Sequence, residues 1–255
     1  MRANPHGGSS TVYQGILRLC LLAGLMLVGA AQALAQQTPV RLELFGLEGG
    51  PMRYRAERTF VESDGKTTET TIFSTPEGTP IQEVVGVFET DTLVPVSYTV
   101  NDQRSGQKET ALREGDKVLM TALEKTGEKE KSGSVKYKEG MIIISSVVPF
   151  IQRNWEALAE GKELTFLLLA PVKQDYFQFR VVKDDGKGEL KVKAPEGAMV
   201  IRMEADTWLI RKMVDPMYFV MDGQPPHRIL EYHGRSSVKT DEGEDQALHY
   251  VNYYE

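Results

Sequence analysis

Cysteine is nearly absent from this sequence, which has one, Cys20, among 255 residues. The scarcity excludes a disulfide scaffold and any metal site built from four cysteines or from two cysteines and two histidines. A basic balance is also absent, since 36 Asp and Glu residues outnumber 30 Lys and Arg residues and give a net charge of −6. This charge argues against a general binder of nucleic acid, which needs a basic surface.

The longest apolar run lies near the N-terminus, where residues 19–31 read LCLLAGLMLVGAA. Arg2 and Arg18 precede this run, and the segment Ala33-Leu34-Ala35 follows it. A basic start, an apolar stretch of this length and an A-x-A site are typical of a secretory signal peptide. We therefore expect a cleaved signal peptide, 1–35, and a single β-rich domain, 36–255, in a periplasmic or secreted protein.

Two alternatives use the same segment. An uncleaved segment would anchor the chain in a membrane, but the run is shorter than the about 20 apolar residues that a spanning helix needs. A lipoprotein would need its cysteine just after the run, whereas Cys20 lies at its front. Cleavage after Ala35 would remove Cys20 and two arginines, leaving 220 residues, a net charge of −8 and no thiol chemistry. The remaining apolar runs are too short for another membrane span.

Glycine after a polar residue recurs along the rest of the chain, as in Asp64-Gly65. Glycine provides the positive φ of tight hairpins, and the intervals of about 7–10 residues have the length of strands. Several intervals alternate with period two, so that Met199, Ile201 and Met203 share one face while polar neighbours share the other. The pattern predicts a mainly β fold with a single large curved antiparallel sheet, a half-barrel or open-barrel meander.

Residues 149–160 (PFIQRNWEALAE) depart from the strand pattern and predict one covering α-helix. Pro149 suits the first helical turn and Gly161 the position after the last. The apolar stripe of this helix consists of Ile151, Trp155 and Leu158. The strongly apolar segments on either side, 141–144 and 164–170, are typical of strands covered on both faces. We expect them in the middle of the sheet, with the helix over one face.

One group of residues has the composition of a metal site. His227, Glu231 and His233 are spaced so that a strand would point all three side chains to one side. Imidazole and carboxylate are good zinc ligands, so a metal-assisted hydrolase is one interpretation. The other interpretation, which we favour because the spacing matches no established motif, is the polar face of a half-buried strand. We therefore expect no metal and no cofactor.

Other candidate sites have simpler interpretations. His233 with Ser236 or Ser237 lacks the G-x-S-x-G turn of a serine hydrolase. The acidic segments 184–186 and 241–245 lack the alternating oxygen ligands of calcium loops and are typical of hairpin tips. Lysine and glutamate alternate between residues 117 and 138, as on a solvated hairpin. The sequence thus favours a protein that is not an enzyme.

Aromatic and methionine side chains are concentrated in the second half of the chain. Core packing explains most of them. A single helix, however, covers only part of a concave sheet and would leave an apolar groove or cavity. We predict that six side chains line this cavity: Trp155, Phe166, Phe177, Phe179, Met199 and Met203.

The order of these elements resembles that of a known type of protein. A signal peptide and a meander are followed by PFIQRNWEALAEG, ELTFLLLA and PMYFVMDGQPPHRILEYHGRSSV. Over most of residues 50–255 the chain is similar to bacterial periplasmic half-barrel proteins of the LolA/LolB lipoprotein-carrier type and related uncharacterised envelope families. The resemblance implies a curved sheet around a helical plug, an apolar cavity and no catalytic residues. The carriers use several helices as a lid, whereas only one is predicted here.

The leading hypothesis is that the domain binds an apolar ligand, either a lipid or acyl chain or a lipidated protein. One alternative is a structural or protein-interaction module of the envelope with a fully packed core. The other is the metal-assisted hydrolase.

Overall fold

The computed structural model describes residues 39–186, 190–212 and 214–254, so the predicted signal peptide and Cys20 lie outside the described residues. Most described residues belong to strands. These are β1 (Val40–Gly46), β2 (Gly49–Ser63), β3 (Lys66–Ser74), β4 (Pro80–Glu89), β5 (Pro95–Asp102), β6 (Lys108–Glu114), β7 (Lys117–Leu123), β8 (Lys131–Lys136), β9 (Met141–Ile142), β10 (Leu164–Ala170), β11 (Asp175–Lys183), β12 (Ala198–Ala205), β13 (Met217–Asp222), β14 (Ile229–Arg235) and β15 (Ala247–Tyr253). The mainly β fold predicted from the sequence is confirmed.

These strands form one sheet in the order β8-β7-β6-β5-β4-β3-β2-β1-β15-β14-β13-β12-β11-β10-β9. The described chain enters at β1 in the middle of the sheet and runs outward by antiparallel hairpins to β8. It then crosses to β9 and β10 at the other end and returns by hairpins to β15, which pairs with β1. The sheet is mixed rather than antiparallel throughout, because β9 pairs with β10 in parallel. Helices between these two strands return the chain to the same end, as a parallel pair requires.

The hairpin between β2 and β3 shows how the turn residues act. Ser63 pairs with Lys66, so the loop consists of Asp64 and Gly65 alone. Both have positive φ, 52° and 71°, as a type I′ turn requires. The sequence prediction of a tight hairpin at this point is confirmed.

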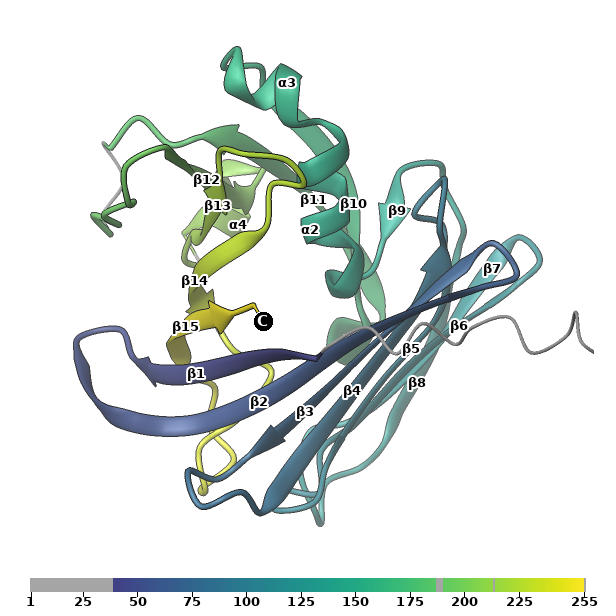
Figure 1. Cartoon of the computed structure of the whole chain (residues 1–255). Helices are drawn as coiled ribbons and strands as arrows, with labels where there is room; N and C mark the ends of the chain where they lie inside the picture. Colours follow the sequence, from purple (N-terminus) through teal and green to yellow (C-terminus); the bar gives the residue numbers. More distant parts are fainter. Residues whose placement is uncertain (1–38, 187–189, 213, 255) are drawn as a thin grey trace, which may run out of the picture. The chain divides into compact units, whose positions relative to one another are not determined.

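The sheet curls until its two ends approach each other (Figure 1). Strand β8 contacts β11, and the 3₁₀ helix η2 (Pro171–Lys173) contacts β7. A side chain at Gly133 of β8 would place its Cβ only 2.9 Å from the Cβ of Gln174, so glycine permits this approach. The prediction that segments 141–144 and 164–170 lie in mid-sheet is wrong, because β9 and β10 end the strand order. Their apolar character reflects coverage by the helical segment between them, whose Phe150 packs on Phe166 of β10.

The predicted covering helix is present as two short ones, α2 (Val147–Arg153) and α3 (Trp155–Ala159). They are separated at Asn154, whose side-chain Nδ2 donates to the Phe150 carbonyl at 2.8 Å. Helix α2 lies on the concave side of the sheet, after the 3₁₀ helix η1 (Ile144–Ser146). Its Phe150 ring packs on Phe166 of β10 with centroids 5.1 Å apart, which confirms the predicted coverage of that strand.

One further short helix, α4 (Trp208–Arg211), was not expected from the sequence. Its four residues carry no long apolar stripe, so the helical period has too few positions to be recognised. Within the described ranges, no helix is both long and apolar enough to cross a membrane.

The convex face of β11 and β12 contains a buried charge. Sequence alternation places Arg202 and Glu204 on a wet face, but Glu204 is only 5% exposed. Its Oε1 accepts from the Nε of Arg180 at 2.8 Å and from the Nη1 of Arg211 at 3.3 Å, while the Nη1 of Arg202 lies 3.6 Å from its Oε2. Three guanidinium groups thus surround one carboxylate, as buried charges require.

Candidate ligand-binding cavity

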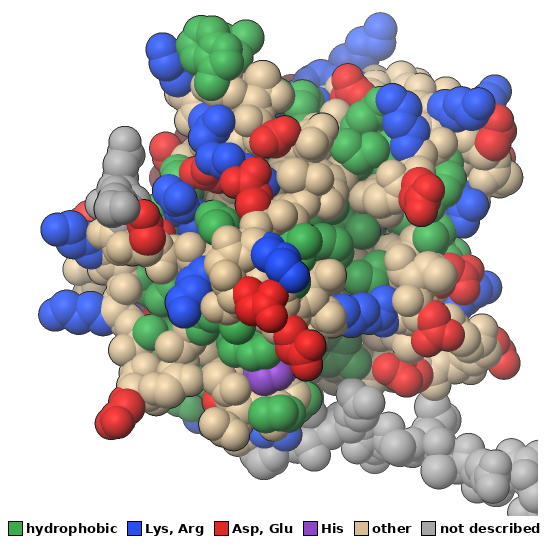
Figure 2. All heavy atoms as spheres, turned by 90° about the horizontal axis from the view of Figure 1, so that it is seen from above, with side chains coloured by type: hydrophobic (Ala, Val, Ile, Leu, Met, Phe, Trp, Pro, Cys, Tyr) green, Lys and Arg blue, Asp and Glu red, His purple; other side chains and the backbone are tan. Residues whose placement is uncertain are grey.

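A cavity of about 1240 Å³ lies between the concave face of the sheet and helix α2. Protein pockets for drug-sized ligands are typically about 300–1,000 Å³, so this one can hold a larger molecule. In the face shown in Figure 2, charged side chains of both signs are interspersed over the surface, and hydrophobic side chains are visible in the depression near its middle.

Most of the cavity wall is apolar. Period-two alternation turns one face of each strand inward, and helix α2 adds residues from its own inner side. The apolar side chains of the wall include Leu42, Phe73, Val84, Phe88, Val148, Leu168, Leu169, Phe177, Phe179, Phe219 and Ile229. Both halves of the sheet contribute, so that residues distant in sequence share one apolar surface.

A charged group interrupts this wall on β2 and β3. The Nε of Arg58 lies 3.1 Å from the Oε1 of Glu69 and donates to the Oγ1 of Thr71 at 3.2 Å. The hydroxyl of Thr71 in turn donates to the same Glu69 oxygen at 3.3 Å. Burial raises the pKa of Glu69 above its ordinary value, and the opposing effects of Arg58 and Thr71 offset only part of that shift.

The Glu69→Gln variant is expected to gain stability relative to the wild type as the pH rises. The raised pKa means that the wild type has the full contribution of this group below the ordinary value of 4.5 and loses it as the pH rises through the native pKa. Glutamine does not titrate, so the difference in unfolding free energy between the two proteins isolates Glu69. Urea unfolding of both at about pH 4 and about pH 7 measures it. The expectation is contradicted if the difference in unfolding free energy does not depend on pH, or if the wild type becomes the relatively more stable protein at higher pH.

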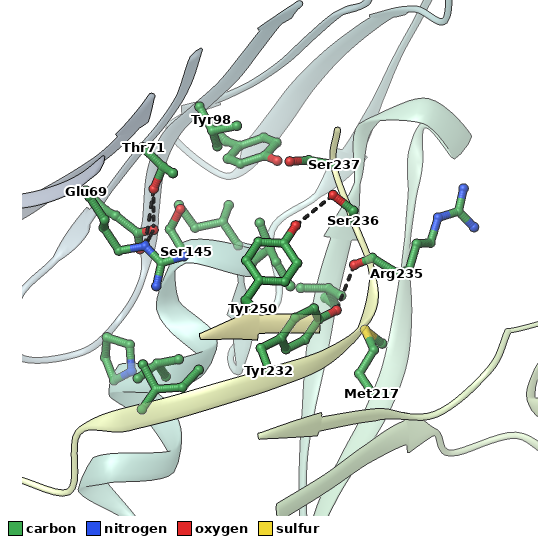
Figure 3. A pocket seen from close by; sticks show the side chains of 18 of the residues that line it. Glu69, Thr71, Tyr98, Ser145, Met217, Tyr232, Arg235, Ser236, Ser237 and Tyr250 are labelled. Atoms are coloured by element: carbon green, nitrogen blue, oxygen red, sulfur yellow. Dashed lines mark hydrogen bonds and ion pairs between the residues drawn. The ribbon is translucent and has the colours of Figure 1, made fainter. Parts of the chain in front are cut away.

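A second polar group is formed by tyrosines and the segment after β14 (Figure 3). The hydroxyl of Tyr250 and the Oγ of Ser236 share a hydrogen bond of 2.6 Å, and the hydroxyl of Tyr232 donates to the Arg235 carbonyl at 2.7 Å. Burial raises the pKa of Tyr250 to about 12 and raises the pKa of Tyr232 well above its ordinary value. These hydroxyls therefore remain protonated at neutral pH and can act as neutral hydrogen-bonding groups.

Tyr98 of β5 belongs to the same wall, and Figure 3 shows its hydroxyl directed toward Ser237. Burial is also the main reason that the pKa of Tyr98 lies well above its ordinary value. A hydrogen bond orients Ser237, because its hydroxyl donates to the Oε1 of Gln82 at 2.8 Å. The cavity thus combines extensive apolar surface with several polar and charged side chains, among them these two groups, and such an arrangement suits amphipathic molecules.

The structure distributes the six sequence-predicted lining residues over several places. Phe177 and Phe179 line the cavity. Phe166 is buried behind the wall, against Phe150 and Phe179. Met199 and Met203 are buried on β12, with Met203 paired with the wall residue Met217. Trp155 lies on α3 and stacks on His227 with ring centroids 4.0 Å apart.

The polar lining was not anticipated from the sequence. Glu69 and Thr71 lie two residues apart in the threonine-rich β3, where they read as ordinary exposed strand residues. Tyr98 lies in an apolar stripe with Val96 and Val100, which gives no sign that its hydroxyl faces a cavity. An ionisable residue on the buried face of a strand is the only signal that the sequence offers, and recognising it requires the register of the sheet.

The three candidate metal ligands of the sequence also separate. His227 precedes β14, has a φ of 57°, and places its Nδ1 3.2 Å from the Asp222 carbonyl oxygen. Glu231 and His233 do share one face of β14, where they meet His249 of β15 instead. Burial, and then the neighbouring His249, lower the pKa of His233 although Glu231 opposes the shift.

Comparisons with known proteins found one similar solved structure. No protein-family model matches the sequence, and no curated protein matches it significantly. Among solved structures, the chain is similar to the crystal structure of a β-barrel-like protein of domain of unknown function DUF1849 from Brucella abortus. The two have a TM-score of 0.45 and 10% sequence identity over 86% of this chain and 97% of that one.

Proposed function

We propose that this protein is an exported envelope protein that binds an apolar or amphipathic molecule, such as a lipid acyl chain or the lipid of a lipidated protein. The observation that carries the proposal is the cavity of about 1240 Å³ with a largely apolar wall. Apolar surface of this extent is costly in water, and a ligand that covers it gains roughly 25 cal/mol per Å² of apolar area before ordering costs.

The two polar groups of the wall define what the ligand should carry. An apolar chain would lie against Leu168, Phe177 and Phe179, and a head group would exchange hydrogen bonds with the hydroxyls of Tyr98 and Tyr250. A lipid-like molecule with a small polar head fits this chemistry.

The same cavity favours ligand binding over the alternative of an interaction module with a packed core. The space is partly open to solvent, and its concave apolar wall offers the kind of surface that a ligand covers. The carrier-like role fits the LolA/LolB resemblance. It also requires that residues 1–35 direct export to the periplasm and are then removed.

The proposal is tested by the Leu168→Glu variant and a fluorescent fatty acid. A carboxylate at this half-buried wall position should weaken probe binding by about tenfold or more, because 1.4 kcal/mol of lost affinity suffices for that change. Leu119→Glu is the matched control, since Leu119 is 38% exposed on β7 and does not line the cavity.

A second variant, Val148→Trp, fills the cavity from α2 without adding charge and should also reduce binding. Circular dichroism establishes that each variant is folded. Saturable binding in the wild type that survives both cavity variants, or no saturable binding by the wild type, contradicts the proposal.

A further inference from the structure

A second site lies on the convex face of the sheet, away from the cavity. Strands β14 and β15 pair antiparallel with His233 directly opposite His249, so both imidazoles project to the same side. Glu231, two residues before His233, projects to that side as well. Tyr232, between Glu231 and His233, and Tyr250, next to His249, face the cavity instead. The two sites are therefore separated by the thickness of the sheet.

The three side chains converge on one point. The Nε2 of His233 and the Nε2 of His249 each lie 3.0 Å from the same carboxylate oxygen, Oε2 of Glu231. The two rings stack with centroids 4.0 Å apart and planes inclined by 11°. One ligand atom from each residue therefore lies within 4.8 Å of the others.

We infer that Glu231, His233 and His249 form a binding site for a divalent transition-metal ion of the zinc type. Two imidazole nitrogens and one carboxylate oxygen are a common ligand set for zinc, cobalt and related ions. Donor atoms around a tetrahedral zinc ion lie roughly 3.3–3.5 Å apart, as its bond lengths of about 2.0–2.2 Å imply. The two imidazole–carboxylate spacings of 3.0 Å need a slight widening, and the stacked rings need to tilt so that both Nε2 lone pairs point at the ion.

The surroundings support a metal ion rather than an exposed polar patch. The three side chains are largely buried, with 13% of His233, 24% of His249 and 26% of Glu231 exposed. Most residues paired with them on the same face are apolar, namely Val220 and Val251 beside Glu231 and Phe45 beside His249, and the buried Tyr218 lies beside His233. An apolar shell excludes competing water and strengthens the attraction between the cation and the carboxylate.

The strands determine what the ion would do. All three ligands come from two adjacent strands of a hydrogen-bonded sheet, so they are held in place before the ion arrives. An ion at this position would join β14 to β15, and three protein ligands would leave one coordination position open to water or another donor. The inference does not depend on the proposed ligand-binding function, because the cavity lies on the other face.

Zinc titration of untagged, chelator-treated protein by isothermal calorimetry tests this inference. We expect one zinc ion per chain and a higher melting temperature with zinc, because an ion that binds the native state stabilises it. His249→Ala and His233→Ala should each lower the affinity by more than about tenfold, since losing even a supporting residue of a metal site costs about 10–100-fold. His227→Ala, outside the cluster, should bind zinc like the wild type.

Cobalt(II) absorption provides a second readout. Tetrahedral cobalt(II) with nitrogen and oxygen ligands has a visible spectrum that differs from that of the octahedral aqueous ion. The wild type and His227→Ala should show this spectrum, and folded His249→Ala should not. Absence of saturable zinc binding by the wild type, or equal binding by the wild type and His249→Ala, would overturn the inference.

Discussion

The Glu204→Ala variant is expected to lose about 3 kcal/mol of unfolding free energy, the lower end of the usual cost of removing one partner from a buried ion pair. Glu204 is 5% exposed and accepts from Arg180 and Arg211, with Arg202 also within reach. Its removal leaves three guanidinium groups without their shared carboxylate. The value lies at the lower end because these arginine side chains are 22–34% exposed and retain some contact with water.

Glu163→Ala is the matched control for this variant. Glu163 accepts from the Nη1 of the same Arg180 at 2.7 Å, but its side chain is 44% exposed. Removal of an exposed partner should cost only about 0.5 kcal/mol. Urea unfolding at neutral pH measures both variants, and a cost for Glu204→Ala no larger than that for Glu163→Ala would show that the buried network does not stabilise the fold.

The Gly86→Val variant is expected to lose about 3 kcal/mol, the upper end of the usual cost of overpacking. Gly86 lies on the concave face of β4, where η1 crosses the sheet. A Cβ at this position would lie 2.3 Å from the Oγ and 2.5 Å from the Cβ of Ser145. Valine would therefore displace η1 and, with it, the start of α2 beside the cavity.

A double-mutant cycle with Ser145→Gly separates this clash from a change in strand propensity. The second substitution removes both close contacts, leaving Ile143 Cδ1 at 3.1 Å from the added Cβ. The double variant should therefore lose less unfolding free energy than the sum of the losses of the two single variants. Additive losses would mean that the contact between η1 and β4 does not fix the helix.

The sequence predicts the local elements of this fold better than their arrangement. The pair Asp64-Gly65 specifies its hairpin by itself, because only its own φ values matter. The pairing of β1 with β15 joins residues about two hundred positions apart, and no local pattern reveals it. The same limit explains why β9 and β10 were expected in mid-sheet, since apolarity indicates coverage but not what provides it.

The candidate sites show the same division. Alternation correctly places Glu231 and His233 on one face, but their third partner, His249, comes from a neighbouring strand that only the register identifies. His227 has the right spacing, yet it lies before β14 begins at Ile229. In the cavity, Phe177 and Phe179 follow from alternation, whereas Glu69 and Tyr98 become recognisable only when the sheet curls.

Native mass spectrometry of the protein purified without detergent from its native cells tests the central claim most directly. The cavity account predicts a population that carries an apolar adduct, which organic solvent releases and which Leu168→Glu retains less well than Leu119→Glu. Wild-type protein that shows only the mass of its polypeptide, and that takes up no fatty acid when one is supplied, would contradict the account.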